Sequence, residues 1–132
     1  MRSFDAPRDR PAPPVRRGRT PEGEDRSIEV REWTLVVAVK PHCDGCRAFI
    51  EGDLHELEQV SVVLVSKTPY VEWRTATQPV LVAPAIFADL EIRAAPFYVL
   101  IDPRTLRVVA EGSLFSPAQV ASEIAPYLTA AM

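Results

Sequence analysis

The sequence predicts an α/β protein in which a central mixed β-sheet is flanked by helices. Two near-continuous apolar runs, at residues 34–39 and 60–65, have the length of strands and lack the alternation typical of a half-exposed strand. A helical pattern lies between them, and this order joins parallel strands through a crossover. An Asp-Pro turn at 102–103 then indicates an antiparallel hairpin, which makes the sheet mixed.

The first run stops at Pro41 and is followed by a predicted helix. Its apolar residues recur at spacings of three and four, while charged residues occupy the opposite face. The apolar positions are Cys46, Phe49, Ile50, Leu54 and Leu57. Gly52 weakens this helix slightly.

Short elements follow the second run. We expect a short helix at 70–74, a brief strand at 80–82 and a second short helix at 84–90. An apolar strand after Pro96 pairs in a hairpin with residues 106–110.

The last element is a helix that begins after residue 116. Ser116 and Gln119 form a capping-box pattern, with proline at the first helical position. Pro126 is expected to kink or end this helix.

Composition divides the 132 residues into a tail and one domain. Residues 1–27 hold seven arginines, five acidic residues and five prolines, with little apolar surface to bury, so we expect a disordered or loosely attached linker. Residues 28–132 are long enough for one domain with its own core. The overall charge of −3 predicts no nucleic-acid partner.

The two cysteines, Cys43 and Cys46, form a C-x-x-C motif at the junction between a buried strand and a helix. A helix N-terminus stabilises a thiolate through its dipole and free amide groups. Cys43 is therefore expected to be the exposed attacking thiol. Cys46 lies one turn further on, faces the core and is expected to resolve the mixed disulfide.

The neighbouring side chains have opposing effects on Cys43. Lys40 and a protonated His42 would stabilise its thiolate, whereas Asp44 would destabilise it. Gly45 gives the turn freedom and leaves the sulfur accessible. These opposing effects leave the reducing or oxidising tendency of the pair open.

A structural zinc site is the alternative use of the cysteines. Zinc needs four ligands, and His42 and His55 are the histidines that the chain offers. His55 lies nine residues beyond Cys46, beside Asp53 and Glu56, and is expected to be a surface residue. We therefore expect no metal and no organic cofactor.

Ala95 and Pro96 precede an apolar strand, and the peptide bond between them is a candidate cis bond. Together with the upstream C-x-x-C motif, this segment is typical of the loop that faces a redox helix.

These segments resemble the thioredoxin superfamily: 34–39, then Cys43-Asp44-Gly45-Cys46, then Ala95-Pro96-Phe97 leading into 99–102. The resemblance covers about residues 28–130 and is strongest to bacterial thioredoxin-like proteins of the cytochrome-maturation and methylamine-utilisation type. It implies thiol–disulfide exchange, with Cys43 as nucleophile, Cys46 as resolving cysteine and Pro96 as a cis-proline that helps to bind an extended substrate segment, next to Ala95.

The chain also departs from thioredoxin. His42 replaces the tryptophan before the first cysteine, and Val37 stands near the position of a buried acid. Glu72 is a candidate replacement for that acid, although a solvated helix face explains it as well. Trp33 and Trp73 are expected to be packing residues.

The predicted function is a thiol–disulfide oxidoreductase that acts on a cysteine-containing protein and is recycled by a redox partner. The alternatives are a non-catalytic adaptor or redox sensor, and a thiol peroxidase. The peroxidases of the superfamily usually carry threonine three residues before the attacking cysteine, where this chain has Lys40.

We expect a monomer. With no signal peptide or transmembrane run, the chain as written is predicted to be cytoplasmic. If an upstream anchor precedes Met1, the alternative is a membrane-tethered protein outside the cytoplasm.

Overall fold

The computed structural model describes residues 10–12 and 15–130. The elements, in chain order, are β1 (Arg10–Pro11), β2 (Val15–Arg19), β3 (Asp25–Glu29), β4 (Thr34–Ala38), α1 (Asp44–Glu51), η2 (His55–Leu57), β5 (Ser61–Ser66), η3 (Val71–Thr75), β6 (Val80–Val82), α2 (Pro84–Asp89), β7 (Phe97–Asp102), β8 (Arg107–Ser113) and α3 (Pro117–Ala130). Here η marks a short 3₁₀ helix.

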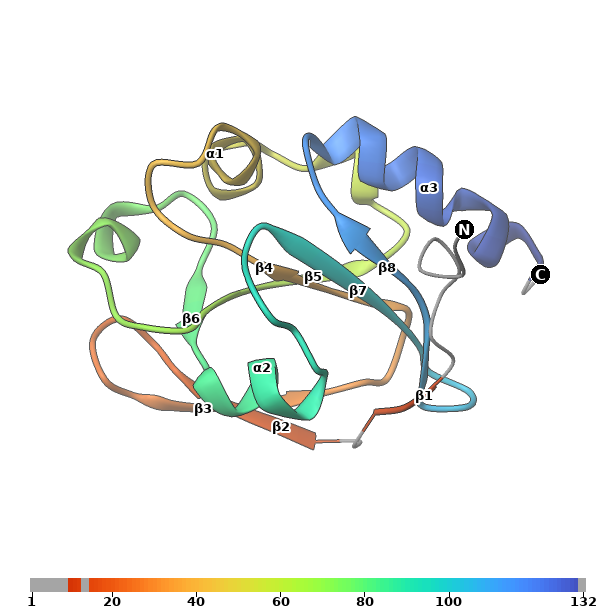
Figure 1. The fold of residues 1–132 in the computed structure, drawn as a ribbon, viewed down its shortest axis with the longest axis horizontal. Coiled ribbons are helices and arrows are strands. Elements are labelled where there is room, and N and C mark those ends of the chain that lie inside the picture. Colours follow the sequence, from red (N-terminus) through yellow and green to blue (C-terminus); the bar gives the residue numbers. More distant parts are fainter. Residues whose placement is uncertain (1–9, 13–14, 131–132) are drawn as a thin grey trace.

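The strands in the described part of the chain form one mixed sheet, in the order β1-β8-β7-β4-β5-β6-β2-β3 (Figure 1). β4 lies in the interior of the sheet, parallel to β5 and antiparallel to β7. Helices α1 and α3 cover one face, and α2 covers the other. The predicted α/β class, with a mixed sheet between helices, is confirmed.

Strand β4 is buried on both faces, as its continuous apolar sequence predicted. Leu35 and Val37 belong to the core cluster that contains the apolar residues of α1 and α3. Val36 and Ala38 belong to the cluster that contains those of α2. Full burial of a valine or leucine side chain contributes about 1.5–3 kcal/mol, so this strand ties both helical layers to the sheet.

The prediction of a loose tail over residues 1–27 was wrong for β2 and β3. These strands pair with each other along their whole length, and Arg19 of β2 pairs with Val82 of β6. Residues 1–9 and 13–14 of the predicted tail lie outside the described residues.

The polar β2–β3 hairpin is stabilised by backbone pairing, a turn and one close packing contact. Gly23 donates its N–H to the Thr20 carbonyl at 2.9 Å and has a positive φ of 94°. Gly18 packs so tightly that an added Cβ would lie 3.0 Å from Cβ of Ala83. The Thr-Pro-Glu-Gly turn was the local signal of this hairpin, because proline suits the second position of a β-turn and glycine the fourth.

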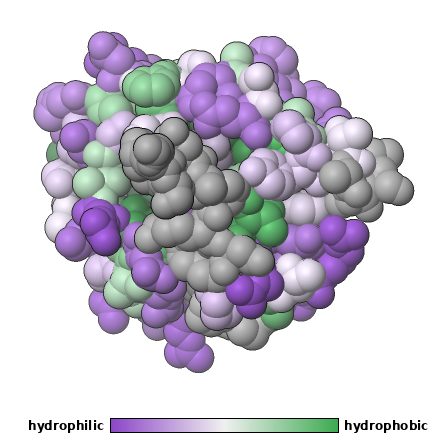
Figure 2. Space-filling view, turned by 45° about the vertical axis from the view of Figure 1, so that its right-hand side comes forward, coloured by the Kyte–Doolittle hydropathy of each residue, from purple (hydrophilic) through white to green (hydrophobic). Residues whose placement is uncertain are grey.

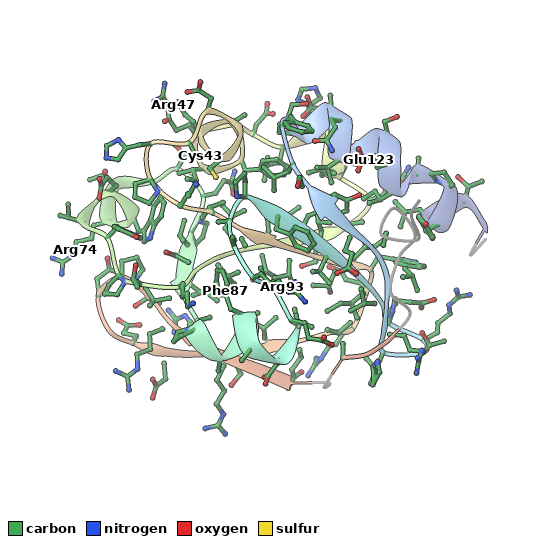
Figure 3. All side chains as sticks on the ribbon, viewed as in Figure 1. Cys43, Arg47, Arg74, Phe87, Arg93 and Glu123 are labelled. Atoms are coloured by element: carbon green, nitrogen blue, oxygen red, sulfur yellow. The ribbon has the colours of Figure 1, made fainter. Side chains whose placement is uncertain are left out.

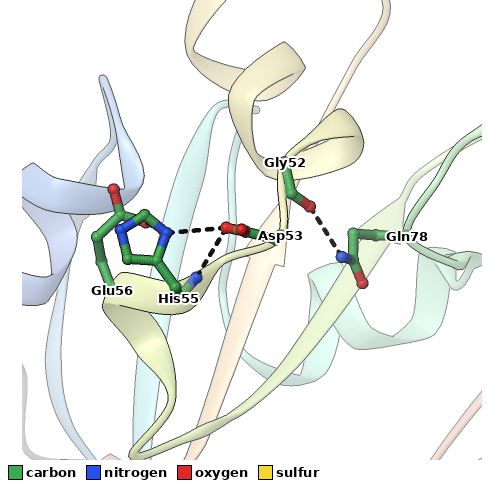
Figure 4. Close-up of polar contacts among 5 residues, drawn as sticks. All are labelled: Gly52, Asp53, His55, Glu56 and Gln78. Atoms are coloured by element: carbon green, nitrogen blue, oxygen red, sulfur yellow. Dashed lines mark hydrogen bonds and ion pairs between the residues drawn. The ribbon is translucent and has the colours of Figure 1, made fainter.

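Helix α1 is shorter than the predicted pattern through Leu57. It ends at Glu51, and Leu54 then adopts a positive φ of 57°. Gln78 explains the stop: its side-chain amide donates to the Gly52 carbonyl at 2.9 Å (Figure 4). Its backbone N–H donates to the carbonyl of Ile50, also at 2.9 Å. The segment after η3 is thereby tied to the end of α1.

Helix α3 begins at the predicted capping box. The Gln119 N–H donates to the Ser116 hydroxyl at 3.0 Å, and the Gln119 side-chain oxygen accepts from the Phe115 and Ser116 N–H groups. The helix continues through Pro126 to Ala130, so the prediction that Pro126 ends it was wrong.

Hydrophilic residues predominate on the face shown in Figure 2, where apolar residues gather in small separate patches. Among the described residues, no helix is both long enough and apolar enough to span a membrane.

Tyr98, on β7, connects the sheet to α3 through a hydrogen bond. Its hydroxyl donates to Oε1 of Glu123 at 2.6 Å, and Glu123 is labelled on α3 in Figure 3. Burial, followed by the bond to Glu123, raises the pKa of Tyr98. The folded state therefore favours the neutral phenol. The contribution of the neutral Tyr98 side chain to the stability of the fold is complete below a pH of about 10. It is lost as the pH rises above that value.

We predict that Tyr98→Phe lowers the free energy of unfolding by about 1 kcal/mol at pH 7, because one hydrogen bond to a charged group is lost. Urea denaturation at pH 7 and pH 10.5 measures this. The difference between the variant and the wild type should shrink at the higher pH. Tyr127→Phe is the control, since its hydroxyl forms no hydrogen bond with the residues that the structure describes, and it should change stability by less than about 0.5 kcal/mol. Equal effects of the two substitutions would contradict the assignment.

Candidate active site

The two cysteines lie where the chain passes from the central strand into α1. Cys43 has an extended backbone, with φ of −125°, and forms the N-cap of the helix. Its Sγ accepts a hydrogen bond from the Cys46 backbone N–H at 3.3 Å. This amide is one of the free donors of the first helical turn. Both cysteines are free thiols. The sulfur of Cys43 thus occupies the position at which a helix N-terminus stabilises negative charge.

The two thiols differ in accessibility. Cys43 is half-buried and lines a pocket of about 550 Å³, whereas Cys46 is fully buried. Burial, and then the hydrogen bond with Cys43, raise the pKa of Cys46 to about 12. A thiol of this kind is a poor nucleophile until it loses its proton, so the geometry favours Cys43 for the first attack.

The loop before β7 reaches the same edge of the sheet. The peptide bond between Ala95 and Pro96 is cis. Ala38, the last residue of β4, pairs with Phe97, the first residue of β7. Because these strands are antiparallel, Pro96 and the loop that leads to Cys43 lie beside each other. Lys40 lines both the pocket that contains Cys43 and a second pocket that contains Ala95.

No protein-family model and no curated protein matches the chain. Its structure is similar to StoA from Bacillus subtilis, with a TM-score of 0.61 and 19% identity, covering 85% of this chain and 98% of that chain. It is also similar to the thioredoxin domain of a thiol-disulfide oxidoreductase from Bacteroides vulgatus, with a TM-score of 0.59 and 16% identity, covering 85% and 93% respectively. The chain has a thioredoxin-like fold.

A third similar structure is a peroxiredoxin-like protein from Aquifex aeolicus, with a TM-score of 0.58 and 12% identity, covering 92% of this chain and 85% of that chain. Proteins named for different thiol chemistries therefore share this thioredoxin-like architecture. At these identities the likeness establishes the fold, and the reaction must be argued from the site.

Gly45, within the motif, is required by close backbone approach. An added Cβ would lie 3.2 Å from the Leu114 carbonyl oxygen and 3.3 Å from that of Phe115. The loop before α3 therefore packs against the first turn of α1. Sequence analysis had assigned Gly45 a role in turn freedom, and the structure adds this packing role.

The three predicted modulating residues have different surroundings. Lys40 is exposed, and both a backbone hydrogen bond from Lys40 and its charge partly offset the raised pKa of Cys46. His42 has a positive φ of 59°, and its Nε2 lies 3.9 Å from Oε2 of Glu72. Asp44 is exposed in the first turn of α1 and does not line the Cys43 pocket. Two of the three thus lie at the pocket.

Glu72 and Trp73, both on η3, line the pocket on the side opposite α1. Trp73 is buried in the core, as predicted, but it also forms part of the pocket wall. Its indole N–H has no hydrogen-bond partner in the described part of the structure. The bonds of Gln78 to α1 hold the chain after η3, and neither bond has a local sequence signal.

Arg47, one of the charged residues on the face of α1 opposite its apolar residues, also lines this pocket. Its Nε lies 3.9 Å from Glu51 on the same helix. Val37 is buried in the same core cluster as Cys46.

His55 is exposed, as predicted, and lies apart from the cysteines. Its Nδ1 lies 2.9 Å from Oδ1 of Asp53, with Glu56 adjacent (Figure 4). The hydrogen bond with Asp53 is the largest cause of the raised pKa of His55, and it also lowers the pKa of Asp53. The hydrogen bond between His55 and Asp53 explains why Asp53, His55 and Glu56 lie close together, so no bound ligand is needed to explain this cluster.

We predict that Cys43 is alkylated by iodoacetamide at least tenfold faster than Cys46 at pH 7.5, because Cys46 is buried and its pKa is about 12. Mass spectrometry of peptides from a time course measures both rates in one sample. The Cys43→Ser variant is the control, since Cys46 should stay slow when it is the one thiol present. Equal rates for the two cysteines in the folded wild type would contradict this prediction.

We predict that Asp53→Asn lowers the titration midpoint of His55 towards the ordinary value of about 6.5. The interaction favours the imidazolium, so its contribution is present below the unfolded pKa and is lost as the pH rises through the higher folded value. NMR titration of the His55 ring protons measures the midpoint. Glu51→Gln serves as control and should leave it unchanged. A midpoint that is insensitive to Asp53→Asn would rule out the assigned cause.

Proposed function

We propose that the protein is a thiol–disulfide oxidoreductase that exchanges the Cys43–Cys46 dithiol or disulfide with a cysteine-containing protein. The observation that carries the proposal is the unequal pair of thiols at the start of α1. Sγ of Cys43 lines a pocket and accepts the Cys46 N–H at 3.3 Å, while the Cys46 thiol is buried behind it. This arrangement supports a nucleophile in front and a resolving thiol one turn away.

The exchange proceeds in two balanced steps. The Cys43 thiolate attacks one sulfur of a substrate disulfide, so that a mixed disulfide forms and the other substrate sulfur leaves and takes a proton from water. Cys46 then loses its proton and attacks Sγ of Cys43, which releases the second substrate thiol. The substrate gains two electrons and two protons, and the chain is left with a Cys43–Cys46 disulfide. The same steps in reverse oxidise a dithiol substrate.

Recycling needs a second protein. A dithiol partner restores the reduced pair when the protein acts as a reductant, and a disulfide partner restores the oxidised pair when it acts as an oxidant. Neither direction requires a metal or an organic cofactor. The unequal thiols support both directions.

The second step depends on how Cys46 loses its proton. The neighbouring core position, Val37, is apolar and cannot accept a proton. The charge of Lys40 favours the Cys46 thiolate, while burial opposes it. We therefore propose that resolution is slower than the first attack, with the proton leaving through the Cys43 side of the pair.

We propose that Ala95 and Pro96 form the wall against which the substrate segment lies. The strand register places this segment beside the loop that leads to Cys43. Lys40, which lines the pockets on both sides, connects the two parts of the site.

The non-catalytic alternative, an adaptor or redox sensor, uses the same cysteines once per molecule. Turnover distinguishes the two functions. An oxidoreductase reduces many equivalents of a protein disulfide when an external dithiol is supplied, whereas a sensor responds with one.

We predict that Cys43→Ser lowers disulfide-exchange turnover at least a hundredfold, because the attacking sulfur is removed. Cys46→Ser should retain the first attack and accumulate a one-to-one mixed disulfide with a substrate protein, visible by non-reducing electrophoresis and mass spectrometry. Circular dichroism confirms that both variants are folded, and the Cys43→Ser/Cys46→Ser double variant supplies the background. Full exchange activity in Cys43→Ser would refute the assigned roles.

A further inference from the structure

The two lysines of this chain lie in one pocket beside the candidate active site. The sequence has thirteen arginines but only two lysines, Lys40 and Lys67. Both line a pocket of about 220 Å³ that also contains Ala94 and Ala95, and no acidic residue of the described chain lines it. Two like charges without a local counter-charge create a site of positive potential.

The sheet register explains why the lysines come together. Ala38 of β4 pairs in parallel with Val65 of β5, so Lys40 and Lys67 each stand two residues beyond a paired position at the same edge of the sheet. Ala38 also pairs with Phe97, which brings Ala95 to the other side of Lys40. The lysines therefore flank the start of the Ala95–Pro96 segment.

Apart from Ser66 and Thr68, the remaining walls of this pocket are apolar. Val39 and Phe87 are buried, and Phe87 is labelled beneath the sheet in Figure 3. Tyr70 is half-exposed at the rim. A side chain with an apolar stem and an anionic end matches these surroundings: the stem contacts Phe87 and Tyr70, and the charge meets the lysine ammonium groups.

The neighbouring pocket provides a contrast. There, Arg47 lies 3.9 Å from Glu51, and Glu72 lies 3.9 Å from His42, so acidic side chains accompany the basic ones around Cys43. Lys40 and Lys67 form no ion pair with any described residue. Among the described residues, positive charge with no acidic residue lining the same pocket thus lies on the Ala95 side of the site.

We propose that this lysine pocket selects substrate proteins with an acidic side chain close to the cysteine that reacts with Cys43. The proposal rests on the oxidoreductase function proposed above and adds a specificity to it. Lys40 reaches both pockets, so a substrate segment that presents its sulfur to Cys43 and runs along Ala95 places a neighbouring residue against Lys40 and Lys67.

The test uses peptide disulfides that differ in one residue. One glutamate is placed in turn at each of the two positions before the cysteine and the two positions after it. Each peptide is compared with the peptide that carries glutamine at the same position. We expect the wild type to favour the glutamate peptide in kcat/KM by about three- to tenfold at the best position, as expected for partly exposed charge pairs. High salt should reduce this ratio, because exposed charges are screened.

Lys67→Gln and Lys40→Gln should each lower the ratio, and Lys67→Glu should bring it below one. Arg74→Gln is the matched control, because Arg74 is an exposed cation of η3 that lines neither pocket. It should leave the ratio unchanged. A wild-type ratio of one at every position, or a ratio that is insensitive to Lys67→Glu, would overturn the lysine pocket as a specificity site.

Two low-molecular-weight disulfides, one uncharged and one with carboxylates, distinguish the remaining outcomes. Absence of exchange with an uncharged small disulfide, and with all peptides, would refute the oxidoreductase function itself. Exchange without a glutamate preference would refute the lysine pocket alone. An equally strong preference for a small disulfide with carboxylates would show that the anion belongs to a low-molecular-weight thiol, and this would also overturn selection of an acidic protein segment.

Discussion

Burial of β4 on both faces is the constraint on which the rest of the structure depends. A strand with no exposed face needs a helical layer on each side, and here α1 and α3 supply one layer while α2 supplies the other. The strand also needs a neighbour on each edge, which β5 and β7 provide in opposite orientations. Val39, the buried residue directly after β4, is therefore the point at which the chain must emerge at the sheet edge.

That exit point determines where chemistry is possible. Cys43 begins the helix that covers β4, so its sulfur lies at the emerging end of the strand and beside a free amide. The antiparallel neighbour brings Pro96 to the same edge, and the parallel neighbour brings Lys67 there. Residues distant in the sequence become neighbours because three strands share this edge. The apolar core thus places the polar site without contributing a charged group to it.

The sequence was sufficient to predict the parts of the fold that are periodic or carry a turn. The apolar run of β4, the C-x-x-C motif at a helix start and the capping box at Ser116 each have a local signal, and each was found. The β2–β3 hairpin was missed because its strands are mostly exposed and polar, so that their low hydrophobic content predicted a disordered segment. Only the Thr-Pro-Glu-Gly turn indicated the hairpin. The end of α1 was missed because it depends on hydrogen bonds from Gln78, which is 26 residues from Gly52.

The residues of the candidate site likewise fall into those that have a local sequence signal and those that do not. Cys43, Cys46 and Pro96 could be predicted as candidate site residues because their spacing relative to predicted strands has a chemical meaning. Arg47 was missed, and the position of Glu72 was left open, because each looks like any solvated residue on a polar face until α1 and η3 are known to line one pocket. Lys40 and Lys67 line the same pocket because of the strand register, and composition and periodicity do not predict that register.

This division separates what the thioredoxin-like fold imposes from what belongs to this chain. The fold requires an apolar central strand, a helix start and an adjacent loop, and proteins of 12–19% identity share that framework. The charges around the thiols come from surface positions that the core does not constrain: the loop after β4, the exposed face of α1, η3 and the segment after β5. Substitutions there change local potential at little cost in packing, because the side chains concerned are exposed. The charges around this position can therefore differ among proteins of this fold while the framework of the core is retained. In this chain, acidic residues of α1 and η3 line the pocket of Cys43, whereas no described acidic residue lines the pocket of Lys40 and Lys67 on the Ala95 side.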